Sequence, residues 1–246
     1  MIHQLLTTEY LFWLVAVFFY LLDSIKLVGK FEILISETFT GKYKPSFSFN
    51  TFEIKGKQVQ LLNFFVPFTG FLILKTIPNE SSSKNFEDVN KKLTDFQKVI
   101  FPFKAISIIS FFYLLSGPIL TYYQGFASAL VFLFPLHLAT LLATVLMLLI
   151  SRKGLNFSYG TVAYIFFDCL FVPAYLPSIV RKIYKKTSFS CDGYYFSLKT
   201  CSESDREDLE YKISRKINQL IEQLDDDDSE KYYSYKNYLG IKNDQL

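Results

Sequence analysis

The amino-acid sequence predicts an α-helical membrane protein organised around a transmembrane hairpin. Two long apolar runs, 105–123 and 127–150, are the basis of this prediction. Each run is long enough to cross a bilayer, since about 20 residues rising 1.5 Å each span the hydrocarbon core. Only a short uncharged link at 122–126 separates the runs, so they are expected to lie side by side as a hairpin.

The composition is that of a folded chain and excludes several other classes. Half of the 246 residues are apolar and 18% are aromatic, which excludes a disordered or fibrous protein. The formal net charge of +3 is too small to indicate a nucleic-acid partner. The three cysteines match no zinc spacing, and only two histidines are present. We therefore expect no metal, no cofactor and no nucleic acid.

The N-terminal segment 1–24 is predicted to be a third, uncleaved span. Residues 5–22 are apolar with one short interruption, no Lys or Arg precedes them, and no small-x-small cleavage site follows before Asp23. The segment therefore lacks the marks of a signal peptide. Lys26 and Lys30 follow it, and positive residues favour the cytoplasmic side of a membrane. The N-terminus is expected to face outward.

Residues 25–98 are predicted to form a small β-rich module on the cytoplasmic side. Apolar and polar residues alternate at 31–36, 46–49 and 52–55, a period of two that is typical of half-buried strands. The module carries eleven lysines and seven acidic residues. Short membrane-flanking segments with such a positive surplus remain inside.

Two further stretches of this module are expected to pack rather than to span. Residues 64–74 are interrupted by Pro67 and Gly70, and as a helix they would cover about 16 Å, half a bilayer. We expect a buried strand or a membrane-dipping segment there. After a polar linker at 79–84, an amphipathic helix leads directly into the hairpin region 99–151. Its apolar face is formed by Phe86, Val89, Leu93 and Phe96.

Residues 152–186 are predicted to form a Pro-broken interfacial or re-entrant segment. The stretch 161–180 is apolar but contains Asp168, Pro173 and Pro177. Four cations follow it at once: Arg181, Lys182, Lys185 and Lys186. If the stretch crossed the membrane, these cations would lie outside, against the positive-inside rule. We therefore expect the segment to stay at the cytoplasmic face.

Residues 187–246 are predicted to form a soluble cytoplasmic tail with a β-hairpin and an amphipathic helix. Asp192-Gly193 is a strong two-residue hairpin signal between 188–191 and 194–199. Ser204 can cap the helix that follows. Its apolar stripe consists of Leu209, Ile213, Ile217, Leu220 and Leu224, and we expect this stripe to bind a partner. The acidic run 225–228 lacks the Gly and Glu that a calcium loop requires, and is expected to be a solvated linker.

Three side chains are weak candidates for catalysis: Asp168, Asp23 and His137. A carboxylate inside an apolar run usually faces a partner, a cavity or a proton path, although Asp168 could also be solvated at the interface. Asp23 lies one turn from Lys26, as an acid beside a head-group anchor or as an i,i+3 ion pair. His137 could act as a base, or hydrogen-bond a neighbouring helix as polar residues in bundles do.

The four cations Arg181, Lys182, Lys185 and Lys186 are also expected to contact lipid head groups. Each cation near an anionic membrane surface contributes on the order of 1 kcal/mol. The alternative is that the cluster only fixes the topology, and both roles are compatible.

Three function classes follow from these observations. The leading hypothesis is an integral, multi-pass membrane accessory or scaffold protein that presents its cytoplasmic module to a protein partner or to a second copy of itself. The alternative is a membrane enzyme acting on a lipid or prenyl substrate at the cytoplasmic face. A transporter or channel is disfavoured by the small number of spans. Since no metalloprotease, serine-hydrolase, P-loop or dinucleotide motif is present, the sequence favours a non-enzymatic role.

Overall fold

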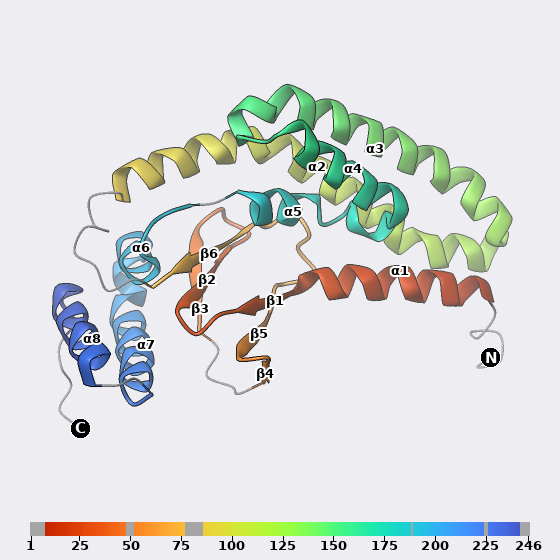
Figure 1. Ribbon diagram of the computed structural model, residues 1–246. Helices are drawn as coiled ribbons and strands as arrows, with labels where there is room; N and C mark the ends of the chain where they lie inside the picture. Colours follow the sequence, from red (N-terminus) through yellow and green to blue (C-terminus); the bar gives the residue numbers. More distant parts are fainter. Residues whose placement is uncertain (1–7, 48–51, 77–85, 188, 224–225, 242–246) are drawn as a thin grey trace. The chain divides into compact units, whose positions relative to one another are not determined.

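The computed structural model describes residues 8–47, 52–76, 86–187, 189–223 and 226–241 (Figure 1). The chain divides into two compact units, and each is described by itself. The first, the helical unit, comprises Met1–Lys26, Leu61–Gly70 and Thr94–Ser188; the second, the sheet unit, comprises Leu27–Gln60, Phe71–Leu93 and Phe189–Leu246. The predicted polar linker at 79–84 lies outside the described residues.

The helical unit is built from α-helices and one short 3₁₀ helix. These are α1 (Thr8–Ser24), α2 (Phe86–Gln124, which enters this unit at Thr94), α3 (Phe126–Leu155), α4 (Tyr159–Phe171), η3 (Pro173–Tyr175) and α5 (Ile179–Lys186). The amphipathic segment that begins at Phe86 and the apolar run 105–123 form one continuous helix, α2, as the sequence predicted. Val89, Leu93 and Phe96 of its apolar face are buried.

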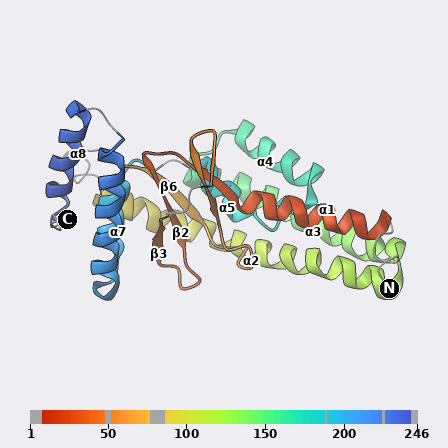
Figure 2. The same cartoon turned by 90° about the horizontal axis from the view of Figure 1, so that it is seen from below.

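A single residue connects α2 to α3. Gly125 has φ +80°, in the left-handed region that glycine adopts without strain, and its N–H donates to the Thr121 carbonyl at 3.0 Å. This turn lets α3 fold back along α2 (Figures 1 and 2). Arg152 and Lys153 lie in the last turn of α3, where positive charge suits the helix dipole.

Helices α2 and α3 are the two described helices that are long and apolar enough to cross a membrane. They contain 39 and 30 residues, and only 39% and 33% of their most apolar windows are buried within the protein. Large apolar side chains on both helices are exposed, among them Phe112, Ile119, Phe132 and Ile150. The pair is compatible with the predicted membrane hairpin.

Helix α1 packs against α2 through its aromatic side chains. The indole N–H of Trp13 donates to the Thr121 hydroxyl oxygen at 2.8 Å. The ring lies so close to Gly117 that a Cβ there would be 2.4 Å from it, so the contact requires glycine. About two turns further on, the Tyr20 hydroxyl donates to the Phe64 carbonyl at 2.5 Å. The predicted N-terminal span is therefore a helix that contacts α2 through Trp13 and, by ring contact with Phe111, through Tyr20.

The stretch 161–180 does not form one straight helix. Helix α4 ends at Phe171 after 13 residues, about 20 Å, and the chain turns at η3 and Pro177 before α5 begins. This agrees with the predicted Pro-broken segment.

The strands form two small three-stranded sheets, and all their residues belong to the sheet unit except Ile25, Lys26 and Leu61. The strands β2 (Glu32–Glu37), β3 (Tyr43–Ser46) and β6 (Phe71–Lys75) form an antiparallel sheet in the order β3-β2-β6. The strands β1 (Ile25–Val28), β5 (Lys57–Leu61) and β4 (Glu53–Ile54) form the other, in the order β1-β5-β4. The end of the predicted apolar stretch 64–74 is thus strand β6. Three consecutive residues of β2, Ile33 to Ile35, are buried.

Three helices complete the sheet unit: α6 (Gly193–Thr200), α7 (Glu203–Ile221) and α8 (Asp226–Tyr238). The β-hairpin predicted at Asp192-Gly193 is wrong, because Asp192 instead caps α6. Its carboxylate accepts a hydrogen bond from the Tyr195 N–H at 2.8 Å, and Asp is also a preferred N-cap residue. A Cβ on Gly193 would lie 2.2 Å from Ile33, so helix and strand are in close contact.

Candidate functional site

Five charged residues of the helical unit come together where α1 ends, α4 ends and α5 begins. They are Asp23, Lys26, Asp168, Arg181 and Lys182, here called the charged cluster. In the sequence they lie in three separate segments, and only the i,i+3 spacing of Asp23 and Lys26 indicated a contact between two of them. The fold brings them together because η3 and Pro177 return the chain from α4 to α5.

Arg181 is the buried centre of the charged cluster. Only 1% of the residue is exposed, yet it donates three hydrogen bonds to other parts of the helical unit. Nη1 donates to the Ser24 hydroxyl at 2.7 Å, and Nη2 donates to the carbonyls of Asn63 and Val66 at 2.6 and 3.1 Å. These contacts tie α5 to the end of α1 and to the loop before Gly70. The predicted contact of Arg181 with lipid head groups is not compatible with this burial.

Lys182 and Asp168 form an ion pair between α5 and α4. The Lys182 ammonium also lies 3.7 Å from the centre of the Tyr175 ring, close enough for a cation–π interaction. Asp168 is therefore neither isolated in an apolar environment nor fully solvated. The pair holds α4 and α5 together across the Pro-broken turn.

Asp23 and Lys26 form the i,i+3 ion pair that the sequence offered as one alternative. Their Oδ1 and Nζ atoms are 3.7 Å apart, and Nζ also donates to the Asp23 carbonyl at 2.5 Å. Burial lowers the pKa of Lys26 to about 8, with Asp23 opposing the shift and the neighbouring cations of α5 adding to it. Asp23 Oδ2 is buried without a hydrogen-bond partner among the described residues. The pair is thus partly desolvated by the fold.

His137 belongs to the hairpin rather than to the charged cluster. Its Nδ1 lies 2.9 Å from the Tyr113 hydroxyl, so the imidazole of α3 is hydrogen-bonded to α2. This is the interhelical contact that the sequence offered as the alternative to catalysis. Tyr113 was not identified from the sequence, because nothing local marks a tyrosine 24 residues away as the partner.

Lys185 and Lys186 are the two exposed cations of α5. The Lys186 ammonium lies 4.2 Å from the centre of the Tyr164 ring of α4. Of the four cations predicted to contact lipid head groups, these two have the exposure that such contact requires.

The apolar stripe of α7 is covered by the protein itself. Leu209, Ile213, Ile217 and Leu220 are buried, and α7 packs against α6 and α8 within the sheet unit. Leu224 lies outside the described residues. A partner that bound this stripe would first have to uncover it.

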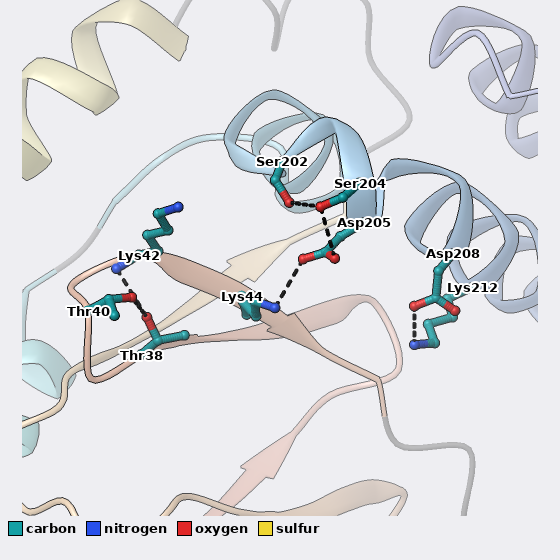
Figure 3. A network of polar contacts seen from close by, with 9 residues as sticks. All are labelled: Thr38, Thr40, Lys42, Lys44, Ser202, Ser204, Asp205, Asp208 and Lys212. Carbon is teal, nitrogen blue, oxygen red and sulfur yellow. Dashed lines mark hydrogen bonds and ion pairs between the residues drawn. The ribbon is translucent and has the colours of Figure 1, made fainter.

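The sequence reasoning missed a group of lysines in the sheet unit. One pocket is lined by Lys42 and Lys44 at β3, by Lys199 of α6 and by Lys212 of α7. Figure 3 shows Lys42, Lys44 and Lys212 together with Asp205 and Asp208. The only local sequence signal for this pocket was the pair of lysines, Lys42 and Lys44, beside the Gly41 turn. No local pattern indicates that Lys44 pairs with Asp205.

Within the described residues, no group of three or more His, Cys, Asp or Glu side chains could hold a metal ion. Comparison with protein-family models, with curated proteins and with solved structures finds no match. The described residues form a mostly helical protein with a small antiparallel sheet region and two helices that are long and apolar enough to cross a membrane.

Proposed function

We propose that the chain is a multi-pass membrane accessory or scaffold protein, anchored by α1, α2 and α3. The apolar side chains that these helices leave exposed support the proposal. Phe18, Phe112, Phe132 and Ile150 would be in contact with water in a soluble monomer, whereas lipid would cover them in a bilayer. The chain would cross three times and hold the sheet unit at the cytoplasmic face.

The state of the charged cluster supports a structural rather than a catalytic role. Arg181 directs its hydrogen bonds to the chain itself, and each of the two carboxylates has a lysine partner. A general base needs a lone pair, and a general acid a proton, that can reach the substrate. In this proposal the cluster fixes the end of the membrane region, and Lys185 and Lys186 contact anionic head groups.

The partner would be another protein or a second copy of the chain, held by the cytoplasmic part. Membranes containing the tagged protein should keep it after washing at alkaline pH. In mild detergent the protein should then migrate as a complex larger than one chain in its micelle. A protein released by the wash would contradict the membrane anchor, and a monomer in every mild detergent would contradict the scaffold.

The second candidate, an enzyme acting on a lipid or prenyl substrate, is favoured by one observation. Two carboxylates and three cations meet in one cluster, and such a set could supply an acid and a phosphate clamp. The substitution Asp168→Asn separates the two functions. A scaffold should keep its complex with this variant, whereas an enzyme should lose its activity in cells while it still inserts into the membrane.

A further inference from the structure

The sheet unit contains a pocket of about 790 Å³ that the proposed function does not use. Its walls come from β3, the first two turns of α2, the end of α6 and the first three turns of α7. Pockets of about 300–1,000 Å³ are typical of small-molecule sites. All of these walls belong to the sheet unit.

The pocket has a surplus of positive charge. Four lysines, Lys42, Lys44, Lys199 and Lys212, line it together with only two carboxylates, Asp205 and Asp208. Lys44 pairs with Asp205 at 3.0 Å, and Lys212 pairs with Asp208 at 2.5 Å. Among the described residues, Lys42 and Lys199 form no ion pair. Two positive charges of the lining are therefore not paired with a carboxylate of the described residues.

The two existing ion pairs do not close the pocket to an anion. The side chain of Lys44 is 63% exposed, and exposed ion pairs contribute at most about 1 kcal/mol. A ligand that carries two negative charges can therefore recruit the ammonium of Lys44 as well as those of Lys42 and Lys199.

The lining also contains an apolar, largely aromatic set, here called the aromatic wall: Tyr43, Phe47, Phe86 and Leu209. The rings of Tyr43 and Phe86 both contact Phe196. A lining that combines lysines with aromatic rings suits a ligand that has an anionic group and an apolar group.

We propose that this pocket binds a phosphate monoester whose ester group is aromatic or aliphatic. The dianionic phosphate matches the two positive charges that are not paired with a described carboxylate, and the ester group would lie against the aromatic wall. The same chemistry occurs in soluble phosphorylated metabolites and in lipids with a phosphomonoester head group, such as phosphatidic acid. The binding experiment distinguishes these two sources.

Cys201 provides a direct probe, because it lines the pocket and is partly exposed. Cys191, in the same unit, is buried and serves as the internal control. The full-length protein in detergent would be treated with maleimide with and without phenyl phosphate, and with benzyl alcohol as the uncharged analogue. In parallel, protein in nanodiscs of phosphatidylcholine would be compared with protein in nanodiscs that also contain phosphatidic acid.

The proposal expects saturable protection of Cys201 by phenyl phosphate, by phosphatidic acid or by both, and no protection by benzyl alcohol. Protection by phenyl phosphate alone identifies a soluble ester, and protection by phosphatidic acid alone identifies a lipid. Lys42→Gln and Lys199→Gln should each weaken binding roughly ten-fold, the usual effect of losing one charge-assisted hydrogen bond.

Lys75→Gln is the matched control, since Lys75 is an exposed lysine of the same unit outside the pocket. It should leave the affinity unchanged. The proposal is overturned if neither phosphate protects Cys201, if benzyl alcohol protects equally well, or if the Lys42 and Lys199 variants bind like the Lys75 control. Both pocket lysines are exposed, so their substitution leaves the fold intact, and an unchanged rate of Cys191 alkylation verifies this.

Discussion

The charged cluster of the helical unit and the lysine pocket of the sheet unit use similar residues in opposite ways. In the charged cluster Arg181 is buried and donates to carbonyl groups of its own chain. In the pocket the lysines are solvated, and two of them have no carboxylate partner among the described residues. A buried cation must be satisfied by the fold, whereas an exposed one is available to a ligand.

The largest effect is expected from removing the buried cation. Arg181→Met would leave the Ser24 hydroxyl and two carbonyls without their donor, and each buried polar group left unsatisfied costs about 1–3 kcal/mol. The fluorescence of Trp13, the single tryptophan, reports on thermal unfolding of the helical unit. Lys185→Met, an exposed position on the same helix, is the control and should melt like the wild type.

If Arg181→Met does not accumulate, Arg181→Lys provides a second measurement. It keeps the charge but cannot span all three acceptors, so it should melt between Arg181→Met and the wild type. Two variants that melted with the wild type would show that the charged cluster does not hold the helical unit together.

The next largest effect is expected from alanine substitution at one glycine of each unit. A Cβ on Gly193 would meet Ile33 at 2.2 Å, whereas on Gly160 the nearest atom is 3.7 Å away. Gly193→Ala should therefore destabilise the sheet unit by about 1–3 kcal/mol through overpacking. Gly160→Ala should stabilise α4 by up to about 1 kcal/mol, because alanine is the better helix former.

Alkylation of the buried Cys191 measures opening of the sheet unit, and Trp13 fluorescence measures the helical unit. Gly193→Ala should accelerate the first, and Gly160→Ala should raise the melting temperature reported by the second. If both substitutions stabilised their unit, or both destabilised it, the packing described here would be contradicted.

A smaller effect is expected from the pH dependence of the helical unit. Burial lowers the pKa of Lys26 from its ordinary 10.5 to about 8. Between these values the unfolded chain binds more protons than the folded chain, so the Lys26 contribution to the free energy of unfolding rises with pH. Unfolding followed from pH 7 to pH 10 should show this rise as a difference between the wild type and Lys26→Met. A difference that stayed constant with pH would contradict the burial of this lysine.

The smallest effect on stability is expected at the exposed Lys44–Asp205 pair. The hydrogen bond from Lys44 lowers the pKa of Asp205. The stabilisation by this pair is therefore present above the ordinary pKa of a carboxyl, and it is lost as the pH falls through the lowered pKa of Asp205. At neutral pH, Asp205→Asn should hardly change the melting of the sheet unit. It should strengthen binding of phenyl phosphate, because it removes a negative charge from the pocket, and weaker binding would contradict this electrostatic account.

The parts of the fold that depend on local patterns could be predicted from the sequence. The two long apolar helices, the amphipathic start of α2 and the break at Pro173 all depend on composition or periodicity within a short window. Asp192 was misinterpreted because Asp-Gly is a signal for a hairpin and Asp is equally a signal for a helix N-cap, and only the contact of Gly193 with β2 decides between them.

The candidate sites could not be predicted in the same way because their residues are distant in sequence. Arg181 meets Ser24 across 157 residues, and Lys44 meets Asp205 across 161. The sequence identified Asp23, Asp168 and the cations of α5 as candidates, but no local pattern indicated that they meet. The burial of Arg181 had no local signal either, since its three neighbours in the cationic run are all less buried.

The proposed topology is tested most directly by the accessibility of Cys201 in intact cells. Cys191 cannot mask it as a disulfide partner, because the eight-residue helix α6 between them is about 12 Å long, beyond disulfide reach. With Cys169 and Cys191 replaced by Ser, Cys201 is the single thiol. A membrane-impermeant maleimide should leave it unlabelled until the membrane is opened, and Thr8→Cys in a cysteine-free chain should be labelled at once. Labelling of Cys201 in intact cells would contradict three spans with a cytoplasmic tail.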